Sequence, residues 1–77
     1  MAEQPNNTAT LLRLPEVERM TGKKRSAIYS EIQSGTFPPP VKIGEGERAS
    51  AWVSSEIQAW IASRIAKRDR ARGRHER

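Results

Sequence analysis

Three consecutive cations stand at the start of a short stretch whose apolar residues recur at helical spacing. Lys23, Lys24 and Arg25 precede Ile28 and Ile32, which lie one helical turn apart. Cations at the N-terminus of an exposed helix can neutralise the phosphates of nucleic acid, although a solvated cationic turn is the alternative. Arg25 has a second option, because its planar guanidinium can bond guanine O6 and N7 in the major groove. The run predicts a nucleic-acid contact and leaves phosphate and base open for Arg25.

The residues that follow the cations place small and polar side chains on the outer face of the same helix. Hydroxyl and amide groups can bond phosphates or base edges, and a methyl side chain can touch a thymine methyl. An ordinary surface role fits each of these positions equally well. The candidate contacts on this face are Ser26, Ala27, Ser30 and Gln33.

A second basic position lies in a stretch that is typical of a β-hairpin. Val41 to Ile43 and Ala49 to Val53 are short apolar runs separated by a glycine-rich turn that carries Arg48. An arginine on such a wing suits a narrow minor groove or a phosphate, and Lys42 on the first strand is a further candidate. Ordinary exposed positions on a hairpin are the alternative for both.

The aromatic residues could stack on unpaired bases, but their spacing favours the core. Trp52 and Trp60 recur with isoleucines at strand and helix spacing, so both are predicted to be buried. Tyr29 is expected at the edge of the core, with its hydroxyl able to reach a phosphate. Glu31 is interpreted as a surface charge that lies away from the phosphates.

Local signals predict the elements that position these residues. Pro15 suits the first turn of a helix that ends at Thr21 and Gly22, and Gly35 stops the next helix, which begins between Lys23 and Ser26. A last helix capped by Ser54 or Ser55 carries an apolar stripe that stops at Ile65. The fold predicted is mainly α with a small β-hairpin: a winged helix-turn-helix of three helices and a two-stranded wing.

The predicted domain is small and is flanked by polar segments. We expect residues 1–10 to form a disordered leader, residues 11–66 the folded domain, and residues 67–77 a basic tail in which the helix frays. This tail could contact DNA by charge, bind a partner or maintain solubility. The predicted core comprises Leu12, Leu14, Val17, Met20, Ile28, Tyr29, Ile32, Phe37, Val41, Ile43, Trp52, Val53, Ile57, Trp60, Ile61 and Ile65.

The net charge of +5 is unevenly distributed along the 77 residues. Lys and Arg minus Asp and Glu give −1 for residues 1–22, +2 for 23–35, −1 for 36–63 and +5 for 64–77. The chain has no cysteine and no apolar run approaching the about 20 residues of a membrane span, so we expect a cytoplasmic, nucleoid-associated protein that does not contact membranes.

Catalysis is not expected. The single histidine, His75, lies in the basic tail, and the sequence offers neither metal-ligand spacing nor a glycine pattern for phosphate binding. No cofactor or metal is predicted. The remaining rival to DNA binding is a protein-interaction module that uses a helix face or the tail.

An ordered set of short motifs resembles the AlpA family of prophage regulators. These motifs are Leu14-Pro15-Glu16-Val17, Thr21-Gly22, Arg25-Ser26-Ala27-Ile28-Tyr29, Phe37-Pro38, Val41-Lys42-Ile43-Gly44, Arg48, Trp52 and Ala59-Trp60. The resemblance implies a winged helix-turn-helix related to the MerR DNA-binding domain and to small phage excisionases. It further implies a double-stranded DNA partner and a role as an activator of integrase genes or as an excision directionality factor. Integrase, RNA polymerase and a second copy on DNA are further candidate partners.

Overall fold

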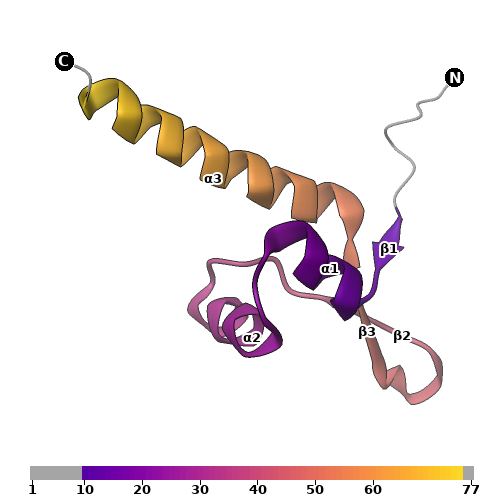
Figure 1. The fold of residues 1–77 in the computed structure, drawn as a ribbon. Helices are drawn as coiled ribbons and strands as arrows, with labels where there is room; N and C mark the ends of the chain where they lie inside the picture. Colours follow the sequence, from indigo (N-terminus) through magenta and orange to yellow (C-terminus); the bar gives the residue numbers. More distant parts are fainter. Residues whose placement is uncertain (1–9, 76–77) are drawn as a thin grey trace, which may run out of the picture.

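The computed structural model describes residues 10–75, which form three α-helices, a 3-10 turn and three short strands. Figure 1 shows α3 beginning beside the sheet and projecting past the other elements. The order along the chain is β1 (Leu11–Leu12), α1 (Leu14–Thr21), α2 (Arg25–Ser34), β2 (Val41–Ile43), η2 (Glu45–Glu47), β3 (Ala49–Val53) and α3 (Ser54–His75).

The helix-turn-helix forms as its local signals predict. Pro15 lies in the first turn of α1, where a missing N–H removes no helical hydrogen bond. Gly22 closes α1 in the left-handed region at φ 76°, and its N–H donates to the Glu18 carbonyl over 2.8 Å. The Thr21 hydroxyl donates to the Val17 carbonyl and accepts the Lys23 N–H, which fixes the turn into α2.

The sheet has three antiparallel strands in the order β1-β3-β2. The predicted two-stranded wing comprised β2 and β3, and the structure adds β1 as a third strand. Lys42 pairs with Ser50 across β2 and β3, while Leu12 pairs with Trp52 across β1 and β3. The Ser54 N–H donates to the Thr10 carbonyl over 2.7 Å, which extends the β1 pairing by one bond. A two-stranded hairpin is marginal in water, and β1 stabilises it by satisfying the second edge of β3.

The predicted leader and tail both differ from the structure where they can be compared. Thr10, assigned to the leader, is hydrogen-bonded to Ser54, whereas residues 1–9 lie outside the described residues. The prediction that the last helix frays after Ile65 was wrong, because α3 continues to His75. Alanine, arginine and lysine are strong helix formers, so this segment remains helical although residues 66–73 are exposed.

The core lies where α1, α2 and α3 meet the sheet. Its buried side chains are Val17, Ile28, Phe37, Ala51, Trp52 and Ile57. All of these except Ala51 were predicted. Half-buried residues that pack against this cluster, also predicted, are Leu12, Leu14, Met20, Ile32, Trp60 and Ile61.

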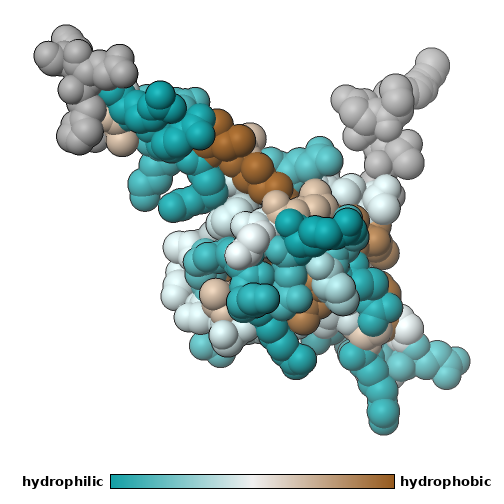
Figure 2. Space-filling view, in the orientation of Figure 1, coloured by the Kyte–Doolittle hydropathy of each residue, from teal (hydrophilic) through white to brown (hydrophobic). Residues whose placement is uncertain are grey.

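Three residues predicted for the core are instead exposed. Tyr29 packs one edge of its ring on Trp52 and leaves 37% of its surface open. Val41 begins the edge strand β2, and Ile65 lies where α3 leaves the rest of the fold. Figure 2 shows hydrophobic side chains along this part of α3 and hydrophilic ones beyond it. Among the described helices, none is both long enough and apolar enough to traverse a lipid bilayer.

Substitution of isoleucine by valine should separate the buried positions from the exposed one. We expect Ile28→Val and Ile57→Val each to lower the free energy of unfolding by about 0.5–1.5 kcal/mol, because both remove a buried methylene. Ile65→Val, the same chemical change at a 46% exposed site, should have little effect. Urea unfolding measures all three, and an equal loss at Ile65 would contradict the exposed position of this residue.

Candidate nucleic-acid interface

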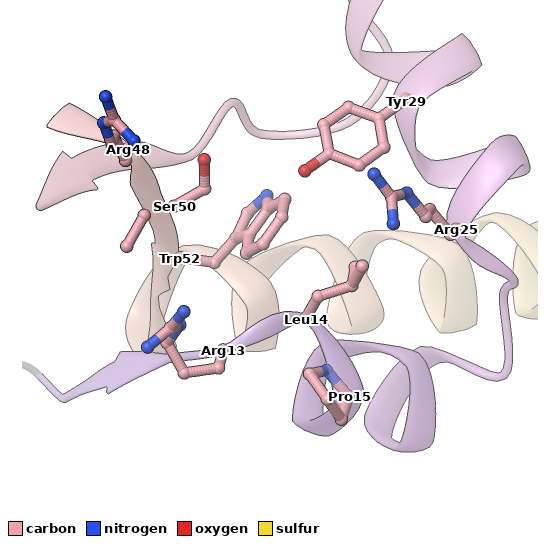
Figure 3. A pocket seen from close by; sticks show the side chains of 9 residues that line it. Arg13, Leu14, Pro15, Arg25, Tyr29, Arg48, Ser50 and Trp52 are labelled. Carbon is pink, nitrogen blue, oxygen red and sulfur yellow. The ribbon is translucent and has the colours of Figure 1, made fainter.

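An open pocket of about 220 Å³ lies between the start of α1, the first turns of α2 and the hairpin of β2 and β3. Figure 3 shows arginines from three separate segments around it, with α3 passing behind them. The lining residues carry three positive charges and no negative one. They are Arg13, Leu14, Pro15, Arg25, Tyr29, Arg48, Ala49, Ser50 and Trp52.

The α2 side of the pocket is built on a stack of aromatic contacts. Arg25 is the first residue of α2, and its guanidinium carbon lies 5.8 Å from the centre of the Tyr29 ring one turn later. Tyr29 in turn meets Trp52 edge-on, with ring centres 6.1 Å apart. The Trp52 indole N–H donates to the Pro38 carbonyl over 3.0 Å. Arg25 is therefore positioned by a chain of contacts that begins in the core.

The hairpin side of the pocket is shaped by an unusual backbone. Gly46 has φ 70° and Glu47 has φ 54°, so two successive residues adopt the left-handed region just before Arg48. A Cβ at position 46 would lie 3.5 Å from Nε of Arg48, an ordinary van der Waals contact, so it is the left-handed φ and not space that favours glycine here. On the neighbouring strand, Lys42 donates to the Ser50 hydroxyl over 3.2 Å, which places a fourth cation beside the pocket wall.

The structure brings together four of the predicted contact residues. Arg25, Tyr29 and Arg48 line the pocket, and Lys42 reaches it through Ser50. The other residues predicted in α2, and Lys24 directly before it, do not line the pocket. Lys24, Ser26, Ser30 and Gln33 are exposed and Ala27 is half-buried.

Lys23 has an intramolecular partner that sequence reasoning missed. Its ammonium lies 2.6 Å from a carboxylate oxygen of Glu31 and 5.9 Å from the centre of the Trp60 ring. Glu31 is half-buried and also accepts from the Thr36 hydroxyl, so it is more than the isolated surface charge predicted. This ion pair joins the turn before α2 to the last part of α2.

The pair changes the acidity of Glu31. The hydrogen bond from Lys23 lowers the pKa of the Glu31 carboxyl below its ordinary value of 4.5, while desolvation acts in the opposite direction. The charge of Lys23, the Thr36 hydroxyl and the charge of Arg64 lower this pKa further.

Arg13 and Ser50 line the pocket but were not predicted from the sequence. Arg13 precedes α1, and its carbonyl accepts the N–H groups of Glu16 and Val17. Its place at the pocket depends on β1 pairing with β3, a contact between residues about forty positions apart. The only local signal is its position directly before a helix that begins with Leu14-Pro15.

Comparison with known proteins identifies the family. The family model described as prophage CP4-57 regulatory protein (AlpA) matches residues 10–65, most of the 77-residue chain. The chain belongs to the AlpA family. It is also 51% identical over 59 residues to an uncharacterized protein, ORF88, of Enterobacteria phage P4. That match covers 77% of this chain and 65% of the phage protein, so the chain spans about two thirds of its relative's length. No solved structure matches the chain.

The AlpA match covers every residue of the pocket and ends at the start of the projecting part of α3. The pocket is thus built within the part of the chain that the family shares. The description of the matching family is that of a prophage regulatory protein.

The ion pair between Lys23 and Glu31 predicts a pH-dependent contribution to the free energy of unfolding. A lowered folded-state pKa stabilises the fold above the ordinary value of 4.5, and this contribution is lost as the pH falls through the lowered pKa. We therefore expect Glu31→Gln to be less stable than wild type near neutral pH and to approach it in acid. Urea unfolding across this pH range gives the difference.

Glu45→Gln is the matched control for the loss of one carboxylate, because Glu45 lies on the exposed hairpin turn. A stability difference between Glu31→Gln and wild type that stays constant with pH would show that the pair with Lys23 does not form in solution.

Proposed function

We propose that this chain is a sequence-specific double-stranded DNA-binding regulator that controls integrase expression or excision of a prophage or genomic island. The observation that carries the proposal is the convergence of Arg25 and Arg48, from the helix-turn-helix and the hairpin, on one open pocket without an acidic lining residue. Family membership supports the regulatory part of the proposal.

The arrangement suits docking on a duplex with α2 in the major groove. The exposed side of α2 carries Ser26, Ser30 and Gln33, which can bond base edges or phosphates. Arg25 stands at the N-terminal end of this helix, where recognition helices contact bases. The hairpin that carries Arg48 and Lys42 then meets the adjacent minor groove.

One domain of this size reads only a short half-site. Single modules bury about 600–1,000 Å² of protein surface on DNA, which limits both affinity and selectivity. The additional affinity and selectivity would come from repeated sites, from self-association on DNA, or from contacts with an integrase or RNA polymerase.

A recombination directionality factor is the alternative, and the length of α3 favours it. Residues 66–73 of α3 are exposed, and Lys67, Arg68, Arg70 and Arg72 make this stretch strongly basic. A helix that projects from the domain can contact a recombinase or neighbouring DNA. Genome-wide mapping separates the two functions, because a regulator occupies promoters whereas a directionality factor occupies clustered sites at an attachment locus.

Two single substitutions test the docking on DNA. We expect Arg25→Ala and Arg48→Ala to weaken duplex binding, and Arg48→Ala to do so by a similar factor on every sequence. A changed order of preference in Arg25→Ala assigns this residue to bases, whereas uniform weakening assigns it to phosphate. Fluorescence anisotropy on a panel of duplexes measures both effects.

Arg19→Ala is the control, because Arg19 is an exposed arginine of α1 that pairs with Glu16 and does not line the pocket. With about six phosphate contacts, the log-log dependence of affinity on salt has a slope near −5. Unchanged binding in both pocket variants would reject the docking, and a slope near zero would favour a protein-interaction module.

The basic part of α3 should act through charge alone. Replacing Lys67, Arg68, Arg70 and Arg72 by Gln should weaken binding equally on all duplexes and flatten the salt slope by about 0.9 for each phosphate that the helix no longer neutralises. Asp69→Asn, on the same helix, is the control of opposite sign and should strengthen binding slightly. A changed sequence preference in the four-Gln variant would contradict this prediction.

A further inference from the structure

We propose that the pocket formed by Arg13, Arg25 and Arg48 holds a single phosphate of the DNA backbone, and that Arg13 is a phosphate-binding residue. The proposal rests on the proposed duplex binding and adds a particular ligand group and a particular residue to it. We call these residues the arginine pocket.

The charge of the arginine pocket calls for an anion. Three arginines from separate segments of the chain line one cavity, and no acidic residue lines it. Three other cations within residues 10–75 have carboxylate partners, in the pairs Arg19 with Glu16, Lys23 with Glu31 and Arg68 with Asp69, whereas the three arginines of the pocket have no acidic residue among the lining residues. Like charges repel at short range, so an anion that lies between the three arginines and offsets part of this repulsion is favoured there.

The remaining lining suits a phosphate group. The N-terminal ends of α1 and α2 both lie at the pocket through Leu14, Pro15 and Arg25, and helix N-termini carry partial positive charge. Tyr29 and Trp52 form an aromatic wall, which excludes water from one side and strengthens charge interactions there. The Ser50 hydroxyl, which accepts from Lys42, adds a polar group beside Trp52 on β3 (Figure 3).

The fold fixes the backbone at the three arginines before any ligand arrives, and at Arg25 it also positions the guanidinium. Arg25 lies over the Tyr29 ring, Arg48 follows the left-handed residues Gly46 and Glu47, and the Arg13 backbone caps α1. A guanidinium that is already oriented loses less conformational entropy when it bonds to phosphate.

Because the pocket lies between α2 and the hairpin, we infer that its phosphate belongs to the backbone of a duplex. When α2 occupies the major groove and the hairpin the adjacent minor groove, one sugar-phosphate strand runs between them. The arginine pocket lies between these two elements. A phosphate held there fixes the register of α2 along the groove.

A duplex in which one phosphate at a time is replaced by a neutral methylphosphonate tests the proposal. We expect wild type to lose about tenfold in affinity at one or two adjacent positions, those that face the pocket. Arg13→Ala should lose affinity on the unmodified duplex, keep its base preference, and lose less than wild type on substitution at these positions, because only Arg25 and Arg48 of the pocket then contact the phosphate. Arg13→Lys should retain part of the affinity, and Arg19→Ala should behave as wild type.

Two results would overturn the proposal. One is an Arg13→Ala variant that loses affinity at the same methylphosphonate positions, and by the same factor, as wild type. The other is a titration with inorganic phosphate, followed by the side-chain NMR signals of the three arginines, in which free phosphate saturates the pocket and duplex DNA does not displace it. If wild type binds no duplex above background, duplex binding itself fails, which the same anisotropy measurement shows directly.

Discussion

The burial of Trp52 is the constraint on which the rest of the structure depends. Trp52 has no exposed surface, although it lies on β3, the central strand of a sheet with only three short strands. Burying so large a side chain contributes much of the apolar area available to a domain of this size. Its indole N–H cannot be left without a partner, and the Pro38 carbonyl accepts it. One residue thereby joins the sheet to the loop after α2, and through Tyr29 to α2 itself.

Trp60 joins α3 to the same loop after α2. Its indole N–H donates to the Thr36 carbonyl over 3.0 Å, and its ring meets Phe37 edge-on at 5.0 Å. The segment from Thr36 to Pro40 lies outside the helices and strands, and its three consecutive prolines exclude helix. Trp52 of β3 donates to the Pro38 carbonyl and Trp60 of α3 to the Thr36 carbonyl in this segment. A loop without regular structure is thereby held in place, and it in turn holds the end of α2.

Local chemistry predicted most elements, because their signals lie within a few residues. Gly22 and Gly35 close α1 and α2, Pro15 opens α1, and both hairpin strands have the predicted bounds. The family resemblance read from these motifs is confirmed by the match over residues 10–65. The length of α3 was missed because charge was given more weight than the high helix propensity of the same residues.

The candidate site was predicted only in part, for a different reason. Arg25, Tyr29 and Arg48 stand out as residue types on elements that local signals place. Arg13 and the third strand depend on pairing across about forty residues, which no local pattern contains. The pair of Lys23 with Glu31 has a shorter separation, but it forms only because the turn at Gly22 brings the Lys23 ammonium back along α2.

The fold presents positive charge in two physically different ways, and this difference bears on how a small domain can be selective. The cations of the projecting part of α3 are exposed on one helix, so they attract DNA without setting a register. The arginine pocket joins three segments whose backbones are fixed, so a phosphate bound there would define a point on the duplex. The ten residues of α2 span only about 15 Å, the length of about four base-pair steps. With so few bases within reach, discrimination requires that α2 meet them in one register, and a fixed phosphate contact beside its N-terminus is the arrangement that would impose it.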